Sequence, residues 1–285
     1  MEKIYHLKKV ILWSALFFVS SISLFSQDLG PIECTDGATF PYTPELLIEQ
    51  IFLGDGVEVT DITFGGDPAA VGFFNHGLDE VGIQRGIVMS TGRACNQSPT
   101  GPYGVEGIRT KFASNDMNST VQDPDLSAIA VTPQTADVAS YSITFIPTAD
   151  TLQFKYVFAS EEYPTYPCTN FNDVFGFFIS GPGINGPLTN NGINIALVPG
   201  TTTPVAISNV HNGNGPGCPP MFEEFYNDNT SSGMQPVFGG VLDVFIAQAI
   251  VIPCEEYTIK LVIGDGGDSA FDSGVFLEAK SFGTG

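Results

Sequence analysis

In the segment Leu152-Gln-Phe-Lys-Tyr-Val-Phe158, a large apolar side chain occupies every second position. A similar period of two recurs over residues 57–64, 141–145 and 257–263. Because successive side chains of a β-strand point to opposite faces of the sheet, this period predicts strands with one buried face. Two almost wholly apolar runs, 174–179 and 244–252, predict strands that are buried on both faces.

Segments rich in Gly, Pro and Asn separate these strands, in a chain that holds 32 Gly and 20 Pro. This pattern is typical of an all-β protein. We expect an antiparallel two-sheet β-sandwich, jelly-roll-like, formed by a single domain over residues 30–283. One short N-terminal helix is also expected. Its signals are Thr43 as the cap, Pro44 in the first turn, Leu47, Ile48 and Ile51 on one face, and Gly54 at the end.

The first residues have the pattern of an export signal. Lys3, Lys8 and Lys9 precede an apolar run at 10–25, and the small residue Ser26 follows it. The run is shorter than the ~20 residues that a transmembrane helix needs, so we expect a cleaved signal peptide over residues 1–26. No later stretch is apolar enough to span a bilayer, so no membrane span is expected in the mature chain. The predicted location is extracellular or on the outer-membrane surface.

The net charge argues against nucleic acid as a partner, and the spacing of the cysteines argues against a zinc site. The chain has 31 acidic and 10 basic residues, a net charge of -21, so nucleic acid is not an expected partner. Its five cysteines show no C-x-x-C spacing, which favours disulfides in an oxidising compartment over zinc. Cys168 and Cys218 both lie in loops rich in Pro, Gly and Asn and are expected to pair. The odd number leaves at least one thiol without a partner in the chain.

Three short acidic runs each border a predicted strand, at 159–164, 170–173 and 265–274. We therefore expect their side chains to converge at one end of the sandwich. Clustered carboxylate and amide oxygens without His or Cys suit Ca²⁺, which takes about six to eight oxygen ligands, so calcium is the predicted cofactor. The candidate metal ligands, of which we expect four to bind directly, are Glu161, Glu162, Asn172, Asp173, Asp265, Asp268 and Asp272. The alternative is ordinary turn chemistry, since Asp, Asn and Gly are common in loops and no EF-hand pattern is present.

Several longer strings, in this order, resemble the choice-of-anchor L domain. They are FKYVFASEEY at 154–163, FNDVFGFFISGPGI at 171–184, NIALVPGT at 194–201 and GDSAFDSGVFL at 267–277, and residues 86–92 and 123–126 also match. The resemblance runs from about residue 40 to Phe282. It implies an exported bacterial surface domain, Bacteroidota-like in its signal peptide. Members of this kind are attached by different C-terminal signals and often continue into a C-terminal sorting domain. The resemblance brings no catalytic residues with it.

Different functional interpretations follow from the same loops. A module for adhesion or recognition of an extracellular glycan or protein needs only a rigid scaffold and exposed loops. Aromatic rings in such loops either stack on a ligand or cover the ends of the sandwich. The aromatic residues in question are Tyr103, Tyr163, Tyr166, Phe222 and Tyr226. A purely structural spacer within a longer surface protein is a further alternative.

A carbohydrate-active hydrolase would instead pair Glu161 or Glu162 with one of the aspartates of the third run as acid and base. Adjacent residues of an extended segment point to opposite faces, which argues against a pair built on both glutamates. Neither G-x-S-x-G nor H-E-x-x-H occurs, and His76 and His211 are expected to be exposed loop residues. We therefore expect a non-catalytic module.

Overall fold

The computed structural model describes residues 33–36, 38, 41–95, 117, 119–130, 135–230 and 238–285. Two expectations fall elsewhere: the signal peptide over residues 1–26 and the loop aromatic Tyr103 lie outside the described residues. Among the described residues, no helix has the length and apolar character needed to cross a bilayer.

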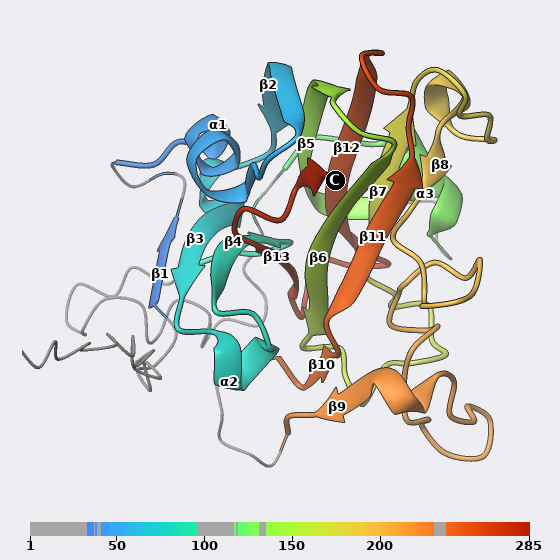
Figure 1. Cartoon of the computed structure of the whole chain (residues 1–285). Helices are drawn as coiled ribbons and strands as arrows, with labels where there is room; N and C mark the ends of the chain where they lie inside the picture. The colour runs from blue at the N-terminus through green and yellow to red at the C-terminus, as the bar shows by residue number, and fades with distance from the viewer. Residues whose placement is uncertain are drawn as a thin grey trace, which may run out of the picture.

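The structure is an antiparallel β-sandwich of two sheets (Figure 1), as the sequence predicted. The larger, nine-stranded sheet is centred on β6 (Thr151–Ser160), with β11 (Phe245–Ile250) and β14 (Gly283–Thr284) also paired to it. Its main strand order is β1 (Glu33–Asp36), β3 (Val71–Asn75), β4 (Arg85–Ser90), β13 (Ser273–Glu278), β6, β10 (Gly240–Leu242) and β9 (Tyr226–Asp228).

The smaller sheet has five strands and packs against the first. Its order is β2 (Val57–Gly65), β5 (Thr135–Pro147), β12 (Tyr257–Gly266), β7 (Val174–Ser180) and β8 (Ile193–Asn194). The predicted strands 57–64, 141–145, 152–158 and 257–263 correspond to β2, β5, β6 and β12. The predicted strand at 174–179 is β7, and its residues are buried on both faces.

The strand predicted at 244–252 is correct in place and wrong in its burial. β11 has an alternating pattern in which Phe245, Ala247 and Ala249 are buried, while Ile246 and Ile250 are 55% and 75% exposed. The cause is that the outer face of the larger sheet is open to solvent here, since Gln153 and Lys155 on the paired strand β6 are exposed as well. An apolar run therefore did not distinguish a strand buried on both faces from a strand with one face toward solvent.

The expected N-terminal helix is present, and Thr43 caps its first turn as predicted. Thr43 accepts a hydrogen bond from the Leu46 amide at 3.3 Å at the start of α1 (Pro44–Leu46). The helix continues as a π-helix, η1 (Leu47–Phe52), and ends at Phe52, with the Leu53 amide bonded to the Ile48 carbonyl. Short helices α2 (Leu78–Val81), α3 (Pro124–Ile129), η2 (Pro68–Ala70), η3 (Thr189–Asn191) and η4 (Glu223–Phe225) lie in connections.

Aromatic residues fill the space between the sheets. Phe282, near the end of the chain, is fully buried and contacts the rings of Phe52, Phe145 and Phe154. Phe154 lies on the larger sheet and Phe145 on the smaller one, so this cluster joins both sheets to the helix that carries Phe52. Contacts of this kind contribute about 0.5–1.5 kcal/mol per pair beyond the burial of the rings. Nearer the acidic runs, the rings of Phe158 on β6 and Phe175 on β7 lie 4.9 Å apart and join the two sheets in the same way.

Candidate functional site

The three acidic runs meet at one end of the sandwich because of how four strands pair. In the larger sheet, the end of β6 lies beside the start of β13, with Ser160 opposite Ser273. In the smaller sheet, the end of β12 lies beside the start of β7, with Gly264 opposite Val174. The segment from β12 to β13 crosses from one sheet to the other. Residues 161–162, 172–173 and 265–272 are therefore neighbours in space, as predicted.

Hydrogen bonds hold the three runs together. The Asp173 carboxylate accepts from the Ser273 hydroxyl at 2.6 Å and from the Gly266 amide at 3.2 Å. Glu161 accepts from the Asp272 amide at 3.1 Å, and its own amide donates to the Asp272 carbonyl at 3.0 Å. These bonds connect the first and second runs to the third, so the loops form one unit.

Most of the carboxylates at this end are buried. Glu162 and Asp173 are each 1% exposed, Asp272 is 2% exposed and Asp265 is fully buried. Of the remaining candidates, Asp268 is exposed and Glu161 is half-buried. An isolated buried carboxylate is strongly disfavoured in its charged form unless it is paired, hydrogen-bonded or bound to a metal. The cluster therefore requires either protons or a cation.

The pKa values of these carboxyl groups show the same need for protons or a cation. Burial raises the pKa of Glu162 to about 9, and the charges of Asp173, Asp268 and Glu161 add to the effect. Burial raises the pKa of Asp173 to about 8, although its hydrogen bonds from Ser273 and Gly266 act in the opposite direction. Burial raises the pKa of Asp272 to about 7 and that of Asp265 well above its usual range. At neutral pH these carboxyl groups therefore tend to bind protons or, in place of protons, a cation.

Several buried carboxylate oxygens have no hydrogen-bond partner among the described residues. They are one oxygen of Glu162 and both oxygens of Asp265 and of Asp272. The Thr91 hydroxyl lies close enough to Asp265 and Asp272 to lower their pKa values but does not reach hydrogen-bond geometry with them. Unsatisfied hard oxygen atoms in a buried cluster fit a divalent cation of the calcium type. The types of ligand atom present thus suit the predicted ion, but the carboxylates of the described residues are not spaced to hold it.

One acidic neighbour of the cluster does not belong to any of the three runs. Asp137 on β5 is 4% exposed, and its charge raises the pKa of both Asp265 and Asp272. It has a φ of 46°, in the left-handed region that a residue with a side chain rarely adopts. Sequence reasoning missed it because it is a lone carboxylate at the start of a strand. The pairing of Asp265 with Ala136 brings it to the site.

Two other candidates have structural partners. The Asn172 amide oxygen accepts a hydrogen bond from the Ser208 amide at 2.9 Å and so anchors the segment that follows β8. Asp268 accepts from the Ala270 amide at 3.2 Å within its own turn. Among the described residues, no three carboxylates hold one oxygen each within 4.8 Å of one another. A single ion with ligands at about 2.4 Å would have to draw them closer and add carbonyl or water oxygens.

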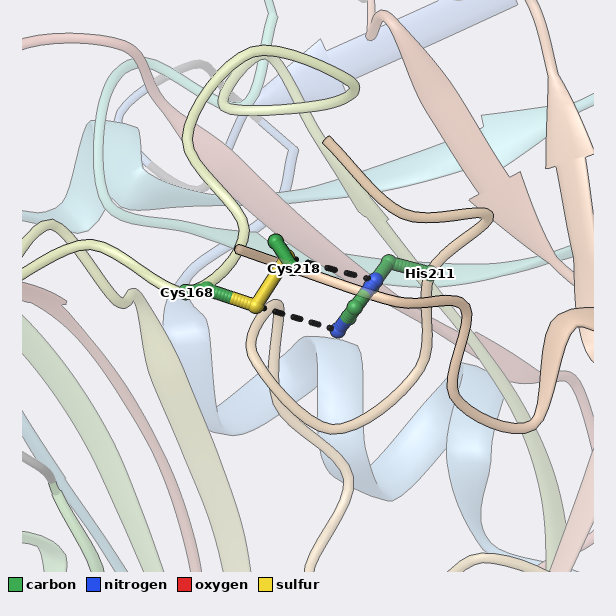
Figure 2. Close-up of side chains that lie close together, drawn as sticks. All are labelled: Cys168, His211 and Cys218. Carbon is green, nitrogen blue, oxygen red and sulfur yellow. Dashed lines mark hydrogen bonds between the residues drawn. A yellow bond between two sulfur atoms is a disulfide. The ribbon is translucent and has the colours of Figure 1, made fainter. Parts of the chain in front are cut away.

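A separate group of possible ligands is a disulfide beside a histidine. The nearest ring nitrogens of His211 lie 3.8 Å from the Cys168 sulfur and 4.0 Å from the Cys218 sulfur, but the two sulfurs are bonded to each other (Figure 2). The pairing of Cys168 with Cys218 confirms the prediction from the sequence. Because both sulfurs are used in that bond, the group is a structural crosslink rather than a metal centre.

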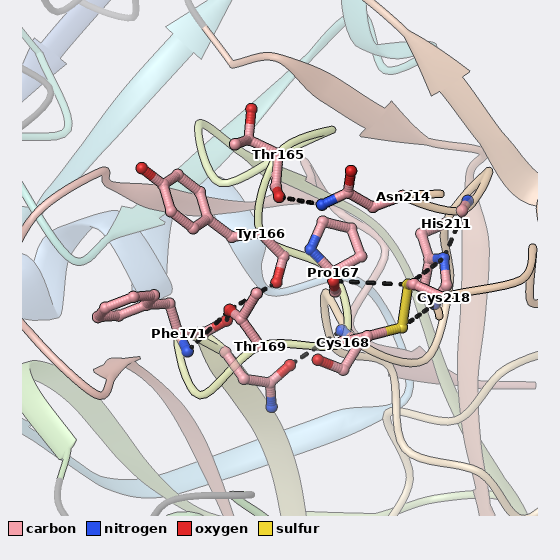
Figure 3. Close-up of a disulfide and its surroundings, with 12 residues drawn as sticks. Thr165, Tyr166, Pro167, Cys168, Thr169, Phe171, His211, Asn214 and Cys218 are labelled. Atoms are coloured by element: carbon pink, nitrogen blue, oxygen red, sulfur yellow. Dashed lines mark hydrogen bonds between the residues drawn. A yellow bond between two sulfur atoms is a disulfide. The ribbon is translucent and has the colours of Figure 1, made fainter. Parts of the chain in front are cut away.

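The position expected for His211 is wrong, because the residue is 1% exposed instead of lying in an open loop. Its Nδ1 accepts a hydrogen bond from the Gly213 amide at 3.0 Å, and burial lowers its pKa. The Asn214 side chain also donates to the Thr165 carbonyl on the other side of the disulfide (Figure 3). The segment around residues 211–218 is therefore packed onto the 165–171 loop that leads to Asp173.

The loop aromatics mostly cover the ends of the sandwich. Tyr163 is 2% exposed and donates to the Val210 carbonyl at 2.6 Å, and its ring lies 5.0 Å from that of Tyr226. Tyr166 is half-buried between Phe171 and Phe271. These rings were expected either to stack on a ligand or to cover the ends of the sandwich, and Tyr163 and Tyr226 cover an end.

A second disulfide joins Cys34 and Cys95, and Cys254 is the exposed free cysteine among the described residues. We expect Cys254→Ser to change the melting temperature by less than about 2 °C, since surface substitutions usually alter stability by less than about 0.5 kcal/mol. The same change should remove any covalent dimer seen on a non-reducing gel. A dimer band that persists in the variant would show that another cysteine is available.

Comparisons with known proteins place the chain in one family. No curated protein and no solved structure matches it. The sequence profile of the choice-of-anchor L domain matches residues 36–283, from β1 to the last strand. This range covers nearly the whole chain and includes all three acidic runs. The protein therefore belongs to the choice-of-anchor L domain family, whose members are surface-associated modules.

Proposed function

We propose that the protein is an exported, calcium-stabilised β-sandwich of the bacterial cell surface that acts in adhesion or recognition and not in catalysis. Family membership supports the surface location, and the two disulfides suit an oxidising compartment. The partner would be an extracellular glycan or protein. Retention at the surface would depend on a C-terminal sorting domain of the kind that the resemblance implies.

The observation that carries the calcium part is the set of buried carboxylate oxygens without hydrogen-bond partners. Glu162, Asp265 and Asp272 carry these oxygens and would hold the ion. Asp173, whose two oxygens already accept from Gly266 and Ser273, would complete the set, and Asp137 adds negative charge beside it. A bound cation would remove the mutual repulsion of these carboxylates and join the ends of β6, β7, β12 and β13. The ion would add to the hydrogen bonds that already join these loops.

Burial also supports a non-catalytic role. An acid and base that cleave a polysaccharide must reach the glycosidic bond from both sides. Of the carboxylates that a hydrolase would use, Glu162, Asp265 and Asp272 are each at most 2% exposed, while Glu161 is half-buried and Asp268 is exposed. Side chains so enclosed suit the binding of a small ion better than contact with a sugar chain.

Thermal unfolding tests the calcium part directly. At about 10 mM Ca²⁺, which is about a hundred times a Kd of about 0.1 mM, binding stabilises the folded state by about 2.7 kcal/mol relative to protein in EGTA. We therefore expect a rise in melting temperature of about 5–10 °C at pH 8. Mg²⁺ at the same concentration should give a much smaller rise, since its octahedral shell suits a flexible cluster poorly.

Matched variants identify the site. Asp265→Asn should lose most of the calcium response, because one fully buried carboxylate is removed. Glu224→Gln removes an exposed carboxylate far from the cluster in sequence and should keep the response. Equal responses in both variants, or no difference between EGTA and Ca²⁺ in the wild type, would contradict the calcium site. Binding of the purified mature protein to whole cells or a glycan array separately tests recognition against a spacer role.

A further inference from the structure

β11 has an open edge. It pairs with β6 along one side, and no other described strand pairs with it. The Val251 amide donates to the Asp150 carbonyl at 2.9 Å, which continues the β6 ladder beyond the strand. Because an antiparallel strand directs alternate residues to alternate sides, Phe245, Ala247 and Ala249 bond to β6. The backbone groups of Ile246, Gln248 and Ile250 then point to the open side.

The side chains along this edge lack the usual protection against pairing. Natural edge strands commonly carry charges or proline, which discourage other chains from adding to the sheet. β11 has the sequence Phe-Ile-Ala-Gln-Ala-Ile, without a charge or a proline. Ile246 and Ile250 are 55% and 75% exposed, and Ile252 beyond the strand is 48% exposed. An apolar stripe of this kind on an acidic protein indicates a binding surface.

A hollow of about 540 Å³ lies beside the first half of this edge. One wall is formed by residues 244–246 and Gln248, and the other by residues 193–195 and 197–201, at β8 and after it. None of the lining residues is charged. The volume lies within the range of about 300–1,000 Å³ that is typical of ligand sites. Figure 1 shows β11 next to β6, with β8 on the neighbouring sheet.

We propose that the open edge of β11 binds an extended peptide segment of a partner protein, which adds as a strand to the larger sheet. Its backbone would bond to Ile246, Gln248 and Ile250, and alternate apolar side chains would contact the exposed isoleucines and enter the hollow. The uncharged lining favours apolar side chains at the centre, and the net charge of -21 favours basic residues at the flanks. The same charge disfavours a second copy of this chain. This inference rests on the recognition role proposed above and names its partner class.

A displayed library of random peptides, selected on the mature chain, tests the proposal. We expect enriched sequences to alternate apolar residues between basic flanks. Gln248→Pro removes one outward amide and leaves the β6 ladder intact, so it should weaken the binding of an enriched synthetic peptide by about tenfold or more. Gln248→Thr keeps the amide and should bind like the wild type. If the proline variant fails to fold, Ile246→Lys with Ile250→Lys replaces it, since both side chains are exposed.

N-methylation of the bound peptide, one residue at a time, separates strand addition from simple apolar contact. Methyl groups at every second position should abolish binding, and those between should have little effect, because only alternate amides face β11. A loss without this period, or enriched peptides that bind Gln248→Pro as well as the wild type, would overturn the proposal. So would concentration-dependent dimers that Gln248→Pro dissolves, which would assign the edge to a second copy. Cell binding that survives Gln248→Pro would overturn this inference and leave the recognition role intact.

Discussion

In EGTA, the melting temperature should fall as the pH is raised from about 5 to about 9. The folded-state pKa is about 7 for Asp272, about 8 for Asp173 and about 9 for Glu162, against about 4 for unfolded carboxyls. Between these limits the folded protein holds protons that the unfolded chain releases. Stability is therefore fully present below pH 4 and is lost as the pH rises through 7 to 9. Each such carboxyl contributes a slope of about 1.4 kcal/mol per pH unit.

Other buried groups do not reverse this trend. Asp125 has a lowered pKa, despite its burial, because Lys260 and Thr189 donate to it, so its contribution changes only at more acidic pH. His211 has a pKa lowered by burial, so it destabilises the folded protein as the pH falls below about 6.5. The two effects oppose each other below about pH 6.5, but the slope of one imidazole is smaller than the summed slope of at least three carboxyls, so we expect the maximum of stability in EGTA near about pH 4.

Calcium should remove most of the pH dependence. A bound cation stabilises the charged carboxylates, so the melting temperature in Ca²⁺ should stay nearly constant from pH 6 to 9. The difference between Ca²⁺ and EGTA should then be largest near pH 9 and disappear near pH 5. In EGTA, Asp265→Asn should have a shallower slope than the wild type, and Glu224→Gln should have the same slope. A flat profile in EGTA would show that the cluster is neutralised by neighbouring protein groups instead.

The sequence predicted where the acidic runs lie more completely than it predicted which side chains contact one another there. Period-two patterns located β6 and β12, and the acidic runs at their ends indicated the convergence that the pairing of Ser160 with Ser273 produces. Asp137 escaped notice because nothing in a local pattern reveals that β5 lies against Asp265. The hydrogen bond from the Ser208 amide to Asn172 is likewise a tertiary contact, between residues 36 positions apart in the sequence.

The composition of a segment also did not predict how deeply its residues are buried. The apolar run at 244–252 predicts a strand buried on both faces, but whether anything covers the outer face of the sheet depends on the arrangement of distant segments. His211 looked like a loop residue because Asn and Gly surround it, yet the Cys168–Cys218 bond folds that loop back onto the 165–171 segment. In both cases the deciding contact joins distant parts of the chain.

Removal of the Cys168–Cys218 bond should have the second large effect. The crosslink encloses 50 residues, and restricting a loop of that length in the unfolded chain stabilises the folded protein by about 4 kcal/mol. The enclosed segment includes β7 and the buried residues Val205, Ile207 and Val210. For Cys168→Ser with Cys218→Ser, we therefore expect a melting temperature about 8–16 °C below that of the wild type.

The same variant should also weaken the acidic site, because the disulfide holds the 165–171 loop from which Asn172 and Asp173 follow. We expect its calcium response to require a higher calcium concentration than the wild type, measured as the midpoint of a titration followed by melting temperature. Cys254→Ser is the matched control, since it removes an exposed cysteine outside any disulfide. Treatment of the wild type with a dithiol also reduces Cys34–Cys95 and should therefore lower the melting temperature at least as far as the double variant does. If the double variant melts within about 2 °C of the wild type, loops 165–171 and 211–218 are held by their packing and hydrogen bonds alone.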